Sequence, residues 1–432
     1  MWMNDDCLRA AVTDSRLSRR ICRKAQCSKR GYSKSSGVPS KLTGWRLSIL
    51  ASYCCLLAAG PAFADPLASP SFSGPLKPNP NPITFDAGPF GSLNVSGQVS
   101  WLGIAQTNPI PLPWAKSPGS LFDLSNAQIE IQTTGTPLTF YVQSGAYAIP
   151  TLGTAYMRAI DTTRQLYGPV PVAYGKWAVT QNLSVQVGAL PTLIGAEAPF
   201  TFQNMNIARG LLWNQEPTIS RGVQVNISDG PISASMSLND GFYSDKYNWV
   251  SGTVSYTINP TNTLAFVGGG NLSDTRKSTV ATPLAQNNSS IYNFIYTYNE
   301  GPLSVSPYLQ YSRVAQNRDI GIDRSAETYG VAILARYSFN DNFSLAGRAE
   351  YIKSSGGSCG AILACTPTNL LYGPGSGAWS LTLTPTYQQG VFFVRGEVSY
   401  TKIEDLTPGF GFGPRFDKKD QVRGMIETGV LF

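Results

Sequence analysis

The stretch QVRGMIETGVLF, from Gln421 to the last residue, Phe432, decides which fold the rest of the sequence must share. A β-strand exposes alternate residues to opposite sides of its sheet. One set here runs from Val422 to Phe432 and is mostly apolar, whereas the other set contains Arg423 and Glu427. The stretch is therefore predicted to be a strand with one apolar face and one face that carries charge, and it ends on an aromatic residue.

Residues 41–64 predict an export signal. Lys41 and Arg46 precede a thirteen-residue apolar run, and the Ala-Phe-Ala that ends the segment fits the small-residue rule for cleavage. A run of that length is too short to cross a bilayer comfortably as a helix. We therefore expect residues 1–64, a long basic n-region and the signal, to be removed, so that the mature chain begins at Asp65. A final strand with a terminal Phe in an exported chain is typical of an outer-membrane β-barrel.

The formal charge of +7 comes from the part of the chain that is predicted to be removed. Residues 1–64 contain eleven Lys or Arg and three Asp or Glu, whereas residues 65–432 contain twenty-two and twenty-three, which leaves a net charge of −1. A basic tail favours nucleic-acid binding. Because all of the excess precedes the cleavage site, we expect no nucleic-acid partner.

The sequence contains no histidine. Histidine is the usual general base and the commonest metal ligand in proteins. Enzymes built on outer-membrane barrels resemble one another in relying on a histidine, so this chain is not expected to be an enzyme. We also expect no catalytic residue, no metal and no cofactor.

Two cysteines, Cys359 and Cys365, remain after the predicted cleavage, and they lie in a stretch rich in Gly and Ser. Two cysteines in an exported protein predict a disulfide. The alternative is a pair of free thiols in a mobile loop.

From residue 92 onward, alternating segments of about ten residues are separated by short turns and longer loops in succession. This pattern predicts an all-β fold, a transmembrane antiparallel β-barrel with polar residues inside and apolar residues outside. Because strand ends are placed to within about two to four residues, fourteen or eighteen strands stay open beside our count of sixteen. The expected strands are near 92–104, 121–132, 137–147, 171–180, 183–190, 221–228, 231–239, 247–258, 263–271, 288–298, 303–313, 326–339, 343–353, 376–388, 391–401 and 421–432.

Aromatic residues recur near the ends of the outward faces. The outward set at 326–339 is apolar and has Tyr329 and Tyr337 near its ends, as the aromatic girdle of a membrane barrel requires. A soluble β-sandwich is the rival fold, and this girdle argues against it. The domain organisation is then a removed segment 1–64, a Pro-rich periplasmic leader 65–91 and the barrel 92–432. The leader is either a plain linker or a segment with a role in the pore.

Several motifs in the loops carry a resemblance to a known family. The chain resembles the OmpL-like β-barrel porins over nearly all of its mature part, and the resemblance implies an outer-membrane barrel and a porin. These motifs have no known chemistry, so they imply no catalytic or ligand residue. They are LPTLIGAE at 190–197, NMNIARGLLWNQE at 204–216, RGVQV at 221–225, NDGFY at 239–243 and LYGPG at 371–375.

The third long loop, 191–220, is the expected constriction, because other sixteen-stranded porins tuck their third loop into the lumen. An acidic loop that faces a basic wall would set a transverse field and select solutes by charge. The alternative is that Arg and Glu residues two apart on one strand merely neutralise each other. The candidate pore-lining residues are Glu197, Arg209 and Glu216 on the loop, with Arg336, Arg348, Glu350, Arg395, Glu397, Arg423 and Glu427 on the strands.

The sequence therefore predicts a diffusion porin in the bacterial outer membrane. Its partners are membrane lipid and small hydrophilic solutes or ions, and a homotrimer is left open. The first alternative is a non-conducting structural or surface-binding barrel. The second is a channel selective for anions or sugars, in which Phe200, Phe202 and Trp213 could form an aromatic slide or simply pack the loop.

Overall fold

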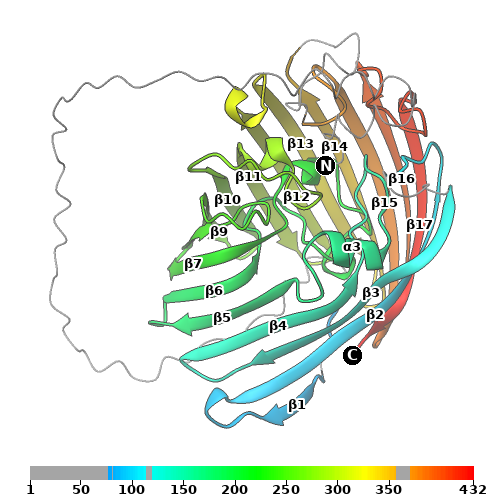
Figure 1. Cartoon of the computed structure of the whole chain (residues 1–432). Coiled ribbons are helices and arrows are strands. Elements are labelled where there is room, and N and C mark those ends of the chain that lie inside the picture. The colour runs from blue at the N-terminus through cyan, green and yellow to red at the C-terminus, as the bar shows by residue number, and fades with distance from the viewer. Residues whose placement is uncertain (1–75, 80, 113–118, 357–369) are drawn as a thin grey trace, which may run out of the picture. The chain divides into compact units, whose positions relative to one another are not determined.

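The chain folds into one closed antiparallel barrel of sixteen strands, β2 to β17. The computed structural model describes residues 76–79, 81–112, 119–356 and 370–432. Each strand pairs with the next along the chain, and β17 pairs back with β2 (Figure 1). The prediction of sixteen strands is confirmed. Their bounds are β2 Ser92–Gln106, β3 Ser120–Thr133, β4 Leu138–Tyr147, β5 Val172–Ala178, β6 Leu183–Pro191, β7 Ile219–Asp229, β8 Ile232–Asn239, β9 Trp249–Asn259, β10 Asn262–Asn271, β11 Ser289–Glu300, β12 Leu303–Val314, β13 Ala326–Ser338, β14 Phe343–Ser354, β15 Gly377–Gln389, β16 Phe392–Glu404 and β17 Asp420–Leu431.

The last strand closes the barrel. Its residues pair with β16 on one side and with β2 on the other, from Arg423 opposite Gln106 to Leu431 opposite Gln98. A sheet edge in lipid would leave backbone groups unpaired, and closure removes that edge. The charged face predicted for this strand points inward, where Arg423 and Glu427 are buried, whereas Ile426 is 55% exposed on the outside.

The other strands also place their apolar residues outward and their polar residues inward, as the sequence predicts. On β15, Leu381 and Leu383 are exposed on the outer surface, whereas Thr382 and Thr384 are buried inside. The barrel therefore has an apolar band for lipid on its outside and a polar inner wall. Pairs of neighbouring strands are joined at one end by tight hairpins, such as that between β7 and β8, where Gly230 takes the positive φ of 54° that a two-residue turn favours.

The phase of β15 leads to a stability prediction. Leu383→Arg is expected to lower the free energy of unfolding by about 2–4 kcal/mol, because it places a charge near the membrane midplane. The matched control is Ser255→Arg on the inner face of β9, where the side chain is half-exposed to the lumen, and it should change the free energy little. Urea unfolding in lipid vesicles measures both, and equal losses would contradict the assigned phase.

Longer connections lie at the other end of the barrel and carry most of the helices, namely α3 Ala159–Gln165, α4 Leu284–Asn287 and the short 3-10 turns η2 Thr201–Gln203, η3 Leu212–Gln215 and η4 Arg318–Ile320. A further 3-10 turn, η1 Gly88–Phe90, lies between β1 and β2, beside the tight turn that joins β3 to β4. Within the described ranges, no helix is both long and apolar enough to cross a membrane. The predicted Cys359–Cys365 disulfide falls outside the described residues.

The described part of the segment predicted as a leader packs on the barrel. Strand β1, Ile83–Asp86, pairs antiparallel with the start of β2 (Figure 1). Before it, Leu76 is buried in the same apolar cluster as the inward residues Phe393 and Leu431. The amide of Gln388 exchanges two hydrogen bonds with the backbone of Lys77, at 2.8 and 2.9 Å.

Candidate functional site

The connection between β6 and β7, residues 192–218, folds into the barrel interior, and we call it the inward loop. Every residue from 201 to 218 is buried. Its apolar side chains, including Met205 and Leu212, belong to one cluster with inward residues such as Leu334 of β13 and Met425 of β17. On this side of the lumen the barrel therefore contains a packed protein core.

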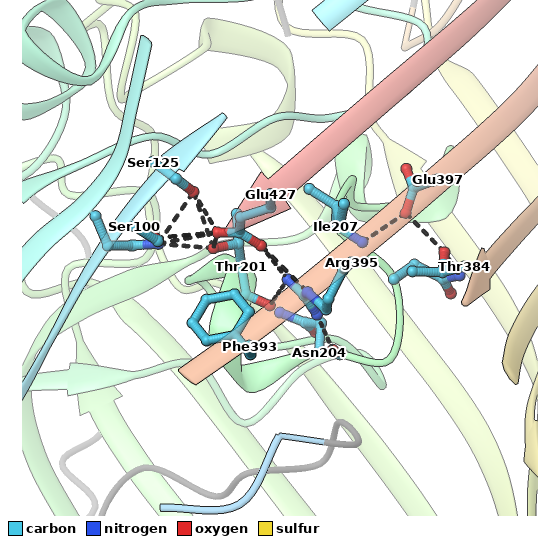
Figure 2. A network of polar contacts seen from close by, with 12 residues as sticks. Ser100, Ser125, Thr201, Asn204, Ile207, Thr384, Phe393, Arg395, Glu397 and Glu427 are labelled. Atoms are coloured by element: carbon cyan, nitrogen blue, oxygen red, sulfur yellow. Dashed lines mark hydrogen bonds and ion pairs between the residues drawn. The ribbon is translucent and has the colours of Figure 1, made fainter. Parts of the chain in front are cut away.

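An ion pair between Arg395 of β16 and Glu427 of β17 holds the start of the buried segment (Figure 2). Both side chains are fully buried. Arg395 donates to the carbonyl oxygens of Thr201 and Asn204, each at 3.0 Å. Glu427 accepts a hydrogen bond from the Thr201 hydroxyl at 2.6 Å and another from Ser125 of β3. The pair therefore binds both the backbone and a side chain of the inward loop.

Two further carboxylates of the wall accept hydrogen bonds from backbone N–H groups of the loop. Glu397 of β16 accepts from Ile207 at 2.5 Å and from Ala208 at 3.1 Å (Figure 2). Glu350 of β14 accepts from Leu211 at 3.0 Å and from the next residue at 3.4 Å. Buried carboxylates are stable only when they are paired or hydrogen-bonded. The loop backbone meets that requirement, so wall and loop stabilise each other.

Arg348 of β14 connects the loop and the wall by charge. Its guanidinium lies 2.7 Å from Glu197 of the loop and 3.2 Å from Glu350, and it donates to the carbonyl of Ala208 at 2.8 Å. The sequence contains two Arg–Glu pairs that lie two residues apart on one strand. Of these, Arg348 and Glu350 form an ion pair. Arg395 instead pairs across the ladder with Glu427.

Two further arginines, Arg209 and Arg423, bind backbone carbonyls. Arg209 donates to Pro199 at 2.9 Å, so it holds the inward loop against itself. Arg423 donates to Thr151 at 2.9 Å and to Thr154 at 3.0 Å in the connection between β4 and β5. A second segment is therefore bound to the inner wall.

Nine of the ten candidate residues are at most 6% exposed. Eight of them form a seam between the inward loop and the wall, whereas Arg423 binds the connection between β4 and β5. Arg336 alone is half-buried, and it lines two cavities. The aromatic residues Phe200, Phe202 and Trp213 are at most 4% exposed, so they pack the loop and present no aromatic surface to a solute. The sequence reading missed the hydroxyl partners of Glu427, Ser100 and Ser125, because serines on a polar face carry no signal of their own.

Glu216 differs from the other carboxylates of the seam. Neither of its carboxylate oxygens has a hydrogen-bond partner in the described part of the chain. A side chain at Gly195 would collide with it, since an added Cβ would lie 1.9 Å from Oε2. Burial raises the pKa of Glu216 well above its usual range, and the nearby Glu197 and Glu350 raise it further. Burial in the docked loop therefore favours the neutral form of Glu216 over the charged form.

Because Glu216 is buried in the docked loop, we expect the stability of loop docking to depend on pH. Because docking raises the pKa of Glu216, the docked loop is favoured below the ordinary carboxylic pKa and is weakened as the pH rises toward the higher pKa of the docked state. Trypsin cleavage after the buried Arg209 should accelerate as the pH rises above the ordinary carboxylic pKa. Glu216→Gln should remove much of that acceleration, whereas Glu404→Gln, at an exposed carboxylate, should leave it unchanged. An unaltered pH profile in Glu216→Gln would contradict the prediction.

Some inward side chains of the wall keep partial exposure, and they gather on β6 to β9. On β6 to β9 the inward side chains are uncharged, and several polar ones keep partial exposure, namely Gln186, Asn226, Ser235, Thr253 and Ser255. The inward threonines of β15, by contrast, are at most 3% exposed. The lumen thus has a packed, charged side and a wetter, neutral side.

A closed sixteen-stranded barrel with an apolar outer band, a polar inner wall and a loop packed inside defines an outer-membrane β-barrel of the porin class. Residues 92–432 match the family model described as putative beta-barrel porin-2, OmpL-like, and the chain belongs to this family. It is an outer-membrane porin, located in the bacterial outer membrane. No curated protein sequence matches the chain.

Solved structures with a similar fold are also outer-membrane proteins, although their sequences are distant. An anion-selective porin from Comamonas acidovorans aligns with a TM-score of 0.53 and 11% identity, covering 79% of this chain and 99% of the porin. The channel DcaP of Acinetobacter baumannii gives 0.52 and 10%, with 79% and 97% covered. OmpT of Vibrio cholerae gives 0.51 and 11%, with 82% and 100% covered. At these identities the likeness concerns the fold alone.

Proposed function

We propose that this porin passes small hydrophilic solutes and ions by passive diffusion, through the part of the lumen that the inward loop leaves open. The proposal is supported by a difference in burial between two parts of the inner wall. The seam from β13 to β17 is packed, whereas β6 to β9 present neutral, partly exposed amide and hydroxyl groups. Such groups replace the hydration of a passing solute and leave no charge that would hold it.

Liposome swelling with uncharged sugars of increasing size tests this function. Vesicles that contain the mature protein should swell in small sugars, and the rate should fall steeply with solute size because the loop narrows the lumen. Heat modifiability on gels shows that the barrel is folded. If folded protein is present and the vesicles swell no faster than empty ones, the non-conducting structural barrel is favoured.

We further propose that the mature chain begins at Asp65 and assembles as a homotrimer. Strand β5 has seven residues, whereas a strand needs about nine to eleven to span a bilayer. A neighbouring subunit would shield this short wall from lipid. A trimer form of OmpT is among the structures of similar fold. Cross-linking in membranes should then give a three-chain product, and monomers alone would contradict it.

A further inference from the structure

Two neighbouring strands of the lumen wall contain the same triplet, Val-Gln-Val, at 185–187 on β6 and at 223–225 on β7. Their register places the triplets directly opposite each other, so Gln186 pairs with Gln224. Alternation along the strands turns Val187 and Val223 outward, where both are exposed, and turns the two glutamines into the lumen. The second triplet belongs to the motif RGVQV, which the barrel fold alone does not explain.

The two glutamines leave one donor and one acceptor unused. The amide nitrogen of Gln224 donates to Gln186 Oε1 at 3.1 Å and to Asn226 Oδ1 at 2.7 Å. Gln186 Oε1 also accepts a hydrogen bond from Asn226 at 3.4 Å. In the described part of the chain, Gln186 Nε2 and Gln224 Oε1 have no hydrogen-bond partner, and neither atom is fully buried. A donor and an acceptor on adjacent side chains are thus available to a solute in the lumen.

At the next inward position toward the inward loop, β6 and β7 carry no side chain, because Gly188 lies opposite Gly222. On β5 the register partner of Gly188 is Tyr174, which is partly exposed. The ring of Tyr174 stacks on Tyr141 of β4, with 5.4 Å between the ring centroids. Because Tyr141 covers one face of this ring, the other face is directed toward β6, where glycine supplies no side chain to cover it.

Lys176 of β5 adds a positive charge beside the glutamines. It is the register partner of Gln186, and its side chain is partly exposed. Within the described ranges, its ammonium group makes no hydrogen bond and no ion pair. The inward positions of β5 to β8 contain no carboxylate, so this part of the wall supplies no opposite charge to Lys176.

We propose that Tyr174, Lys176, Gln186 and Gln224 form a binding site for sugars in the lumen, and that acidic sugars bind there more tightly than neutral ones. A sugar presents a face of C–H groups and a rim of hydroxyl groups, each of which both donates and accepts. The uncovered face of Tyr174 packs against the C–H groups. Gln186 Nε2 donates to one hydroxyl, Gln224 Oε1 accepts from the next, and Lys176 binds a carboxylate where the sugar has one. This inference names a substrate class for the proposed diffusion function and rests on it.

Block of the ion current in planar bilayers tests the sugar site. Xylose, glucose and glucuronate should each reduce the potassium chloride current of the intact porin saturably, and glucuronate should do so at a several-fold lower concentration than glucose. The control solute is triethylene glycol, which has nearly the mass of xylose but lacks adjacent hydroxyl groups. It should reduce the current only as much as it reduces the conductivity of the bulk solution.

Three variants assign the contacts. Gln224→Met and Gln186→Met keep the length of the side chain and remove the amide, so each should raise the half-blocking concentration of glucose several-fold while the sugar-free conductance stays the same. Lys176→Met should leave the block by glucose nearly unchanged and remove the advantage of glucuronate. The matched control is Thr253→Val on β9, at a partly exposed inward residue outside the site, and it should change neither value.

Two results would overturn the sugar site while conduction itself remains. One is equal block by xylose and triethylene glycol, and the other is a half-blocking concentration of glucose that both glutamine variants leave unchanged. An advantage of glucuronate that survives in Lys176→Met would show that the ammonium group does not bind the carboxylate, and it would overturn the preference for acidic sugars. A silent bilayer with folded protein would instead refute the diffusion function.

Discussion

Arg395→Leu is expected to release the inward loop from the wall. The substitution removes the ion pair with Glu427 and both hydrogen bonds to the loop carbonyls, and it leaves Glu427 buried without its cation. Removing one partner of a buried ion pair costs about 3–5 kcal/mol. Docking should weaken accordingly, so trypsin should cleave after Arg209, which is fully buried in the docked loop. Protease digestion followed by mass spectrometry measures the cleavage.

Two variants control for this result. Arg415→Leu removes a guanidinium whose side chain is 78% exposed, so cleavage after Arg209 should stay at the level of the intact protein. The double variant Arg395→Leu with Glu427→Leu removes both charges, and it should recover part of the lost docking because no charge is left buried alone. A loop that stays protected in Arg395→Leu would show that the ion pair does not hold it.

Deletion of Thr201 to Leu212 is expected to raise single-channel conductance several-fold. This segment contains the groups that bind Arg395, Glu397 and Glu350, and it forms part of the packed core on one side of the lumen. Without the segment, water should fill that side and solvate the freed carboxylates, so the barrel itself should remain folded. Recording in planar bilayers measures the change. Heat modifiability on gels checks that the deletion variant still forms a barrel.

The deletion also has a chemical control. A cysteine in place of Thr382, which is 3% exposed beneath the loop, should resist water-soluble thiol reagents in the intact barrel and react quickly in the deletion variant. A cysteine in place of Ser233, which is exposed on β8, should react in both. Unchanged conductance together with newly reactive Thr382→Cys would mean that the loop is docked but does not limit the current.

Much of the fold could be predicted because alternation along a strand is a local property. The two faces of 421–432 and of the strand near Leu383 are visible in the sequence, and closure follows from the need to pair backbone groups in lipid. Strand β1 could not be predicted in this way. Its four residues follow a Pro-rich stretch and are too few to show a period, and only their pairing with β2 identifies them as a strand.

The sequence shows which of the strands' candidate side chains point inward, but it does not show which of them the inward loop covers. Arg336 and Arg348 are indistinguishable in sequence, since both are inward arginines on neighbouring strands. The inward loop covers Arg348 and leaves Arg336 at a cavity, and no local pattern encodes that difference. The partner of Arg395 was likewise hidden, because Glu427 becomes its neighbour only through the register of β16 and β17.

Planar-bilayer recording of residues 65–432, the proposed mature protein, is the most direct test of a water-filled lumen narrowed by a docked loop. The expected result is discrete conductance steps that are clearly smaller than those of the variant lacking Thr201 to Leu212, in the same lipid and salt. Bilayers that stay silent with the folded, heat-modifiable intact protein would contradict a diffusion porin and favour a structural barrel.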